Sequence, residues 1–128
     1  MEKKFSKSWK SSSQTRKQRK YVFNAPLHIK HKLASSTLSK ELRKDYSIRS
    51  VPVRVGDIVT VKSGQFKGIS GKVTKVSLAR VFAHVEGAVL KRADATEAHY
   101  PIHPSNLEIT KLNLDDKLRV AKIKRAKK

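Results

Sequence analysis

The stretch RVGDIVTVKSGQFKGISGKVTKV, residues 54–76, combines alternating apolar side chains with repeated glycines. Apolar residues at every second position are typical of a β-strand that buries one face. Glycine tolerates positive φ angles and close backbone approaches because it has no Cβ atom. The stretch therefore predicts two strands joined by a tight loop, with Phe66 anchoring the loop to the fold and Lys62, Lys67 and Lys72 projecting from it.

The two-residue period continues on both sides of this stretch. It begins at VPVRV, residues 51–55, and returns in RVFAHVEGAVL, residues 80–90, and in NLEITKL, residues 106–112. Short strands punctuated by glycine and proline are typical of a small antiparallel barrel. We therefore predict a mainly β fold over residues 51–112, with about five strands and a core that is marginal by itself.

The first part of the chain, residues 1–23, is predicted to form a basic arm. Residues 1–20 contain few large apolar side chains, so they cannot bury enough surface to offset their ordering entropy, and we expect them to be disordered in isolation. Phe5 and Trp9 are the exceptions. These two rings are expected either to contact the body of the protein or to stack on a nucleobase.

Residues 24–50 predict a helical extension in two pieces. Asn24 is a candidate N-cap, with Pro26 in the first turn. The segment ASST, residues 34–37, interrupts the helical pattern, and Thr37 is a candidate N-cap for a second helix. Short helices of this kind are expected to dock on a larger body.

Residues 113–128 restart a helical pattern and end in a basic tail. Asn113 is a candidate N-cap, and the two aspartates that follow it suit a helix N-terminus. Leu118 and Ala121 are expected to form a narrow apolar stripe on this helix.

The chain of 128 residues carries 30 Lys and Arg against 10 Asp and Glu, a formal net charge of +20. The excess is concentrated in residues 1–50 and 113–128, outside the predicted barrel. Self-repulsion of this size opposes a compact state, and a basic arm is typical of proteins that bind nucleic acid or another polyanion. The absence of cysteine excludes disulfides and thiolate sites. No apolar run approaches the length of a membrane span or resembles a secretory signal, so neither is expected.

The chain lacks residues that the nucleotide-binding motifs of enzymes require at fixed positions. A phosphate-binding Walker A loop would need Gly at position 66 and Ser or Thr at position 73, where the chain has Phe66 and Val73. The spacing of the glycines does not match a dinucleotide-binding fingerprint either. His28 and His31 have a helical spacing that can chelate metal, but without a nearby carboxylate or cysteine we interpret them as polar surface or RNA-contacting residues. We therefore predict neither an enzyme nor a cofactor or metal site.

The stretch quoted first resembles a KOW motif, the glycine-centred β-loop of ribosomal and transcription-elongation proteins. The segments FNAP, LSKELR, GQFKGISGKV and IHPSN follow one another in the chain. With them, the chain resembles the universal KOW protein of the large ribosomal subunit in its archaeal and eukaryotic form, from about Arg16 to Lys117. The family that it resembles is twenty-fourth in the universal large-subunit numbering and twenty-sixth in the eukaryotic one. The alternative is a KOW-containing transcription elongation factor, which would need a further α/β domain that residues 1–50 are too short and too basic to supply.

This resemblance implies an SH3-like barrel with a helical N-terminal extension and basic tails. It also implies binding to the 5′ domain of the large-subunit rRNA near the polypeptide exit tunnel, and a role in early subunit assembly. Large-subunit rRNA and neighbouring large-subunit proteins are the expected partners, with a cytoplasmic, ribosomal location and no homo-oligomer.

Candidate RNA contacts are carried over from the matching motifs. They are Arg16, Lys17, Arg19, Lys20 and Asn24; His28, Lys30, His31 and Lys32; Lys62, Lys67 and Lys72; and His103, Ser105 and Asn106. Six further basic side chains complete the predicted set, namely Arg43, Arg49, Arg54, Lys111, Lys117 and Arg119.

Overall fold

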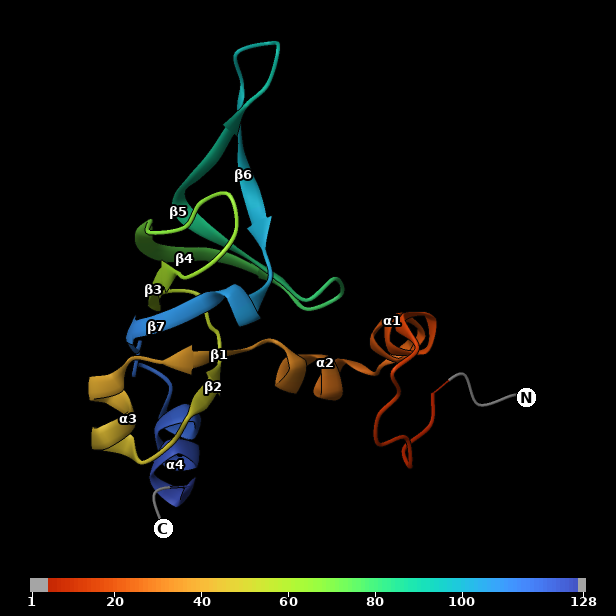
Figure 1. The fold of residues 1–128 in the computed structure, drawn as a ribbon. Coiled ribbons are helices and arrows are strands. Elements are labelled where there is room, and N and C mark those ends of the chain that lie inside the picture. Colours follow the sequence, from red (N-terminus) through yellow and green to blue (C-terminus); the bar gives the residue numbers. More distant parts are fainter. Residues whose placement is uncertain (1–4, 127–128) are drawn as a thin grey trace.

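The computed structural model describes residues 5–126. Within them, strands form one curled, barrel-like sheet with helices at its sides, as the mainly β prediction requires (Figure 1). The strands are β1 (Ser35–Leu38), β2 (Ser50–Pro52), β3 (Ile58–Val61), β4 (Ser70–Ser77), β5 (Phe82–Lys91), β6 (Glu97–Ile102) and β7 (Leu107–Lys111). The helices are α1 (Thr15–Asn24), α2 (Leu27–Leu33), α3 (Lys40–Tyr46), α4 (Lys117–Ala126) and the 3₁₀ helix η1 (Pro104–Asn106).

The sheet has the strand order β2-β1-β7-β3-β4-β5-β6. Neighbouring strands run antiparallel except β1 and β7, which run parallel with Leu38 opposite Ile109. The sheet has more strands than the five or so predicted, because β1 lies within the predicted helical extension and β6 was not predicted as a separate strand.

The core lies inside the curled sheet and follows the two-residue period of the strands. In β3, Val59 and Val61 are buried, whereas Ile58 is partly exposed. Alternation of this kind places one face of each strand in the interior. The fully buried apolar side chains of the core include Leu38, Val59, Val61, Val73, Val85, Leu107 and Ile109.

Residues 35–38 form a strand where the sequence predicted an interruption of the helical pattern and a second helix capped by Thr37. They form β1 because Thr37 and Leu38 pair with β7, and Leu38 is fully buried in the core. Ser39, not Thr37, caps α3, since its hydroxyl accepts a hydrogen bond from the Leu42 backbone N–H at 3.4 Å. Tertiary pairing therefore overrides the local helical pattern at this position.

The expectation of disorder, which covered residues 1–20, is wrong for residues 15–20, because they lie in α1. Asn24 accordingly ends this helix instead of capping the next one. The Trp9 ring stacks on Tyr21 with centroids 4.3 Å apart, and the Phe5 ring lies 4.9 Å from the same tyrosine. Aromatic contacts of this kind stabilise a segment whose other side chains are mainly polar, so Phe5 and Trp9 contact the protein's own body.

The C-terminal helix docks by a face other than the predicted one. Leu118 is 80% exposed, while Arg119 and Ile123, one turn apart, are buried. The carboxylate of Asp116 accepts a hydrogen bond from the Leu118 backbone N–H at 2.8 Å, so Asp116 takes the capping place predicted for Asn113. The apolar stripe was wrongly assigned because a buried arginine takes part in the docking face.

Candidate nucleic-acid interface

The KOW loop, residues 62–69, connects β3 to β4. Gly64 and Gly68 adopt φ angles of +99° and +91°, which side-chain-bearing residues rarely tolerate. A Cβ atom at Gly71 would collide with the backbone carbonyl oxygen of Glu86 on β5. The glycines therefore serve the tight turn and the close backbone approach that the sequence predicted.

Phe66 anchors this loop, as predicted. It is partly buried against the core, and its ring centroid lies 5.0 Å from that of Tyr100 on β6. Lys67, in the loop, and Lys72, on β4, are exposed. The Lys62 ammonium lies 3.0 Å from the Glu108 carboxylate, so its charge is partly neutralised within the protein.

The 3₁₀ helix η1 lies directly beside the KOW loop. The Ser63 hydroxyl donates to the Asn106 side-chain oxygen at 2.9 Å, and the Lys62 backbone N–H donates to the Asn106 carbonyl at 2.8 Å. His103 caps η1, because its Nδ1 atom lies 2.7 Å from the Ser105 hydroxyl and accepts from the Ser105 backbone N–H. The fold thus brings together two predicted groups that are far apart in the sequence.

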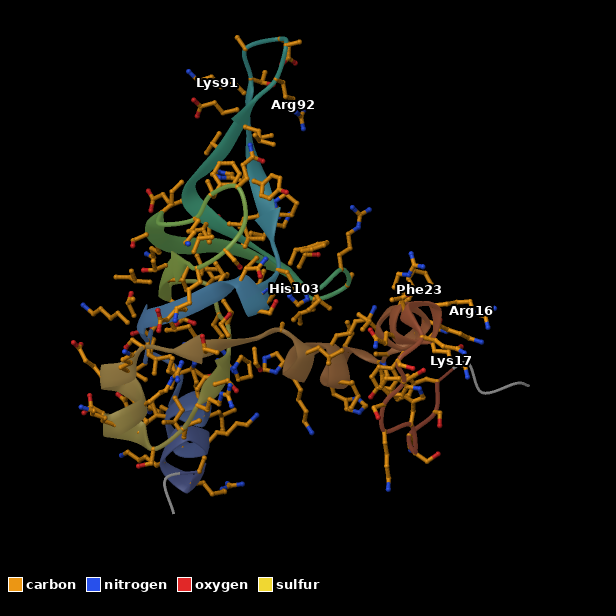
Figure 2. All side chains as sticks on the ribbon, in the orientation of Figure 1. Arg16, Lys17, Phe23, Lys91, Arg92 and His103 are labelled. Atoms are coloured by element: carbon orange, nitrogen blue, oxygen red, sulfur yellow. The ribbon has the colours of Figure 1, made fainter. Side chains whose placement is uncertain are left out.

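The helices α1 and α2 carry the next group of predicted contacts. The side chains of these helices that were predicted to contact RNA are exposed, except for the partly buried Asn24 and His31 and the buried Lys30. Figure 2 shows Arg16 and Lys17 on α1, which stands to the side of the barrel. The exposed predicted side chains of this group are Arg16, Lys17, Arg19, Lys20, His28 and Lys32.

Two predicted RNA contacts are directed into the protein. The Lys30 ammonium donates to the Ala79 carbonyl at 2.9 Å, and the lysine is 8% exposed. Arg119 is 5% exposed, and its guanidinium binds the fully buried Asp57. Burial of both cations leaves little of either for a phosphate, so neither enters the interface that we propose below.

The other predicted cations either form contacts within the protein or lie outside the KOW loop, η1, α1 and α2. Arg43 Nε donates to the Leu38 carbonyl at 2.7 Å, and Arg54 forms an ion pair with Asp116. Three predicted cations are exposed but lie outside the KOW loop, η1, α1 and α2, namely Arg49, Lys111 and Lys117.

His31 lies in a cationic environment at the base of α4. Burial lowers the pKa of His31 below its usual value of 6.5, and the positive charges of Arg54, Lys122 and Arg119 lower it further. The imidazole is therefore held in its neutral form to a lower pH than an exposed histidine.

The comparison with known families decides between the two KOW classes. The family model for the eukaryotic ribosomal protein L26 and its archaeal counterpart L24 matches residues 12–126. The chain belongs to this family. Its members are structural proteins of the large ribosomal subunit and not known enzymes, and they bind rRNA and other ribosomal proteins.

The family match is wider than the resemblance found in the sequence, which ran from about Arg16 to Lys117. It includes residues 12–15, which lead into α1, and all of α4. The helix that buries Arg119 is therefore part of the family's pattern and not an addition to it.

Some exposed basic and aromatic side chains were missed by the sequence prediction. Lys91 and Arg92 lie at the tip of the long β5–β6 hairpin (Figure 2), and an adjacent Lys-Arg pair between two predicted strands would have indicated them. Phe23 is 81% exposed on α1, and its place in the quoted segment FNAP was its only signal. Arg80 lies in the β4–β5 turn, which has no distinguishing motif.

Other classes of site find no support within residues 5–126. This part of the chain contains no group of three or more His, Cys, Asp or Glu side chains placed to hold a metal ion. Among the same residues, none of the helices has the length and apolar character needed to cross a membrane.

Proposed function

We propose that the chain binds the 5′ domain of the large-subunit rRNA near the polypeptide exit tunnel and acts early in subunit assembly. The interface consists of the KOW loop, η1 and the exposed cationic faces of α1 and α2. The barrel recognises a folded RNA surface through its shape, phosphates and 2′-hydroxyl groups, which are the accessible features of A-form RNA.

One observation carries the proposal: the KOW loop, η1 and α1 border one continuous surface. Phe82, at the start of β5, lines a cavity of about 210 Å³ beside the KOW loop and η1. The same residue lines a second cavity of about 520 Å³ beside α1. The shared wall joins the two regions, so one folded RNA can contact both at once.

The charge of this surface favours a polyanion. Within residues 5–126, three ion pairs form, and of their cations only Lys62 belongs to the proposed interface. The other exposed lysines and arginines of the interface therefore carry charge that no carboxylate of the described chain neutralises. Phosphates can neutralise it, with release of the counterions that surround the RNA.

Binding of the whole protein to separate rRNA fragments tests the proposal. We expect tighter binding to the 5′-domain fragment than to fragments of the other domains, with an affinity that falls steeply as KCl concentration rises. Equal affinity for every fragment, or an affinity that does not depend on salt, would overturn the proposed site.

Charge-reversal variants localise the interface. Lys67→Glu in the KOW loop is expected to weaken binding and to reduce the salt slope by about 1. Lys44→Glu is the matched control, since Lys44 is an exposed lysine of α3, on the other side of the barrel from α1 (Figure 1). Equal losses in both variants would indicate a non-specific charge effect and contradict the proposed surface.

The assembly role needs a separate measurement in cells. Depletion of the protein is expected to accumulate early large-subunit precursors, visible by sucrose-gradient fractionation and rRNA analysis. Accumulation of late precursors alone would contradict the early role, and association with RNA polymerase in place of the large subunit would revive the elongation-factor alternative.

A further inference from the structure

A cavity of about 520 Å³ opens between α1 and the β4–β5 turn. Arg19 and Phe23 belong to its α1 wall, and Arg80 and Phe82 belong to the opposite wall. Cavities of about 300–1,000 Å³ are large enough for small planar ligands. Its main features are thus two phenyl rings and two guanidinium groups.

Phe23 has no structural role that would explain its position. Its side chain is 81% exposed on α1, and within residues 5–126 no aromatic ring pairs with it. By contrast, Trp9 and Phe5 of the same region are engaged with Tyr21. Phe23 therefore offers a ring face to a partner.

The opposite wall is held in place at an energetic cost. Val81 has a φ angle of 59°, an outlier for a β-branched residue, and its side chain is 1% exposed. The buried Lys30 ammonium binds the carbonyl of Ala79 in the same turn. Backbone strain that the surrounding structure maintains is concentrated at functional sites. Here the burial of Val81 and the Lys30 hydrogen bond hold the strained turn that carries Arg80 into the cavity wall.

The chemistry of the four side chains selects the occupant. Aromatic rings stack on unpaired bases, and arginine guanidinium groups stack on bases or bind phosphates. A purely apolar peptide would leave both guanidinium groups without partners. An unpaired nucleotide satisfies all four side chains, because it joins a planar base to an anionic backbone.

We propose that this cavity receives one unpaired nucleobase of the large-subunit rRNA, stacked on Phe23, with Arg19 and Arg80 beside its flanking phosphates. The inference rests on the proposed function, since it requires that the chain binds rRNA. It adds a base-stacking site to an interface otherwise made of backbone contacts.

Substitution of the exposed ring tests the site without disturbing the core. Phe23→Ala is expected to weaken binding of the 5′-domain rRNA fragment about 5- to 150-fold, while Phe23→Trp retains it. Leu114→Ala, which removes a half-exposed apolar side chain outside the cavity, is the control and should leave the affinity unchanged. Unchanged affinity in Phe23→Ala would overturn the stacking site while leaving the proposed rRNA binding intact.

A fluorescence measurement distinguishes stacking from mere proximity. The chain has one tryptophan, so the double variant Trp9→Phe, Phe23→Trp carries a single reporter in the cavity. We expect the 5′-domain fragment to quench this tryptophan strongly, and to leave the corresponding Trp9→Phe, Leu114→Trp reporter nearly unchanged. Bound RNA without quenching at position 23 would overturn the inference, and absence of binding by the wild-type protein would overturn the proposed function together with it.

Discussion

Arg119 of α4 forms a bidentate ion pair with Asp57, with distances of 2.6 Å from Nη1 to Oδ1 and 2.7 Å from Nη2 to Oδ2. Asp57 also accepts hydrogen bonds from the backbone N–H groups of Arg54 and Asn113, both at 2.9 Å. Arg119 in turn donates to the carbonyls of Asn113 and Pro52. The pair therefore ties the C-terminal helix to the strand-turn-strand region where the barrel begins.

Removal of either partner should destabilise the protein strongly. Asp57→Asn leaves a buried guanidinium without its counter-charge, and loss of one partner of a buried pair costs about 3–5 kcal/mol. Urea unfolding followed by circular dichroism measures the change. Arg125→Gln removes an exposed arginine from the same helix and should have little effect. If the two variants were equally stable, the ion pair would not be what holds α4.

Gly64 of the KOW loop and Gly71 of β4 should differ in their tolerance of alanine. Gly71→Ala forces a Cβ atom against the Glu86 carbonyl, and we expect a loss of about 3 kcal/mol or more. Gly64→Ala meets no atom within 4 Å and suffers only from its positive φ, at a cost of about 1–2 kcal/mol. Thermal unfolding of the two variants should therefore rank Gly71→Ala as the less stable. The reverse order would contradict the close approach of β4 and β5.

Neighbouring residues of the KOW loop should separate folding from binding. Phe66→Ala removes a ring packed on Tyr100 and should lower the stability by about 2 kcal/mol, less than for a fully buried phenylalanine. Lys67→Glu should leave the melting temperature nearly unchanged, because its side chain is exposed, and should weaken rRNA binding. Melting and binding measured on the same preparations test both. Normal rRNA affinity in Lys67→Glu would reduce the loop to a structural element.

The pH dependence of the free energy of unfolding should reflect the protonation of His31. Its pKa is lowered in the folded protein, so the unfolded chain binds more protons as the pH falls through about 6.5. Stability is therefore unaffected above this pH and decreases as the pH falls towards and through the folded pKa. His31→Asn should flatten this part of the profile, as measured by urea unfolding from about pH 7.5 to about pH 5, a range that includes the ordinary pKa of histidine.

The cause of this shift can be tested separately by nuclear magnetic resonance titration. Lys122→Gln removes one of the nearby positive charges and should raise the pKa of His31 towards its usual value. A midpoint at or above 6.5 in the wild-type protein would contradict the buried, cationic environment.

Local patterns predicted the barrel because its strands and turns depend on neighbouring residues. The alternation of Val59 and Val61, and the positive φ angles of Gly64 and Gly68, depend only on the local chain. Local patterns failed at Thr37, which was predicted to cap a helix, because Thr37 and the buried Leu38 pair with β7. Pairing with a distant strand has no signature in the local sequence.

The amino-acid sequence by itself determined the β-loop around Phe66, the basic character of the surface and the family resemblance, because local motifs, their order along the chain and the composition carry them without knowledge of distant contacts. Only the tertiary structure decided which cations face outward. Lys30 and Arg119 look like any other basic residue in the sequence, yet distant acceptors, the Ala79 carbonyl and the Asp57 carboxylate, hold them within the protein. The cavity beside Phe23 likewise exists only because α1 and the β4–β5 turn, more than fifty residues apart, meet in space.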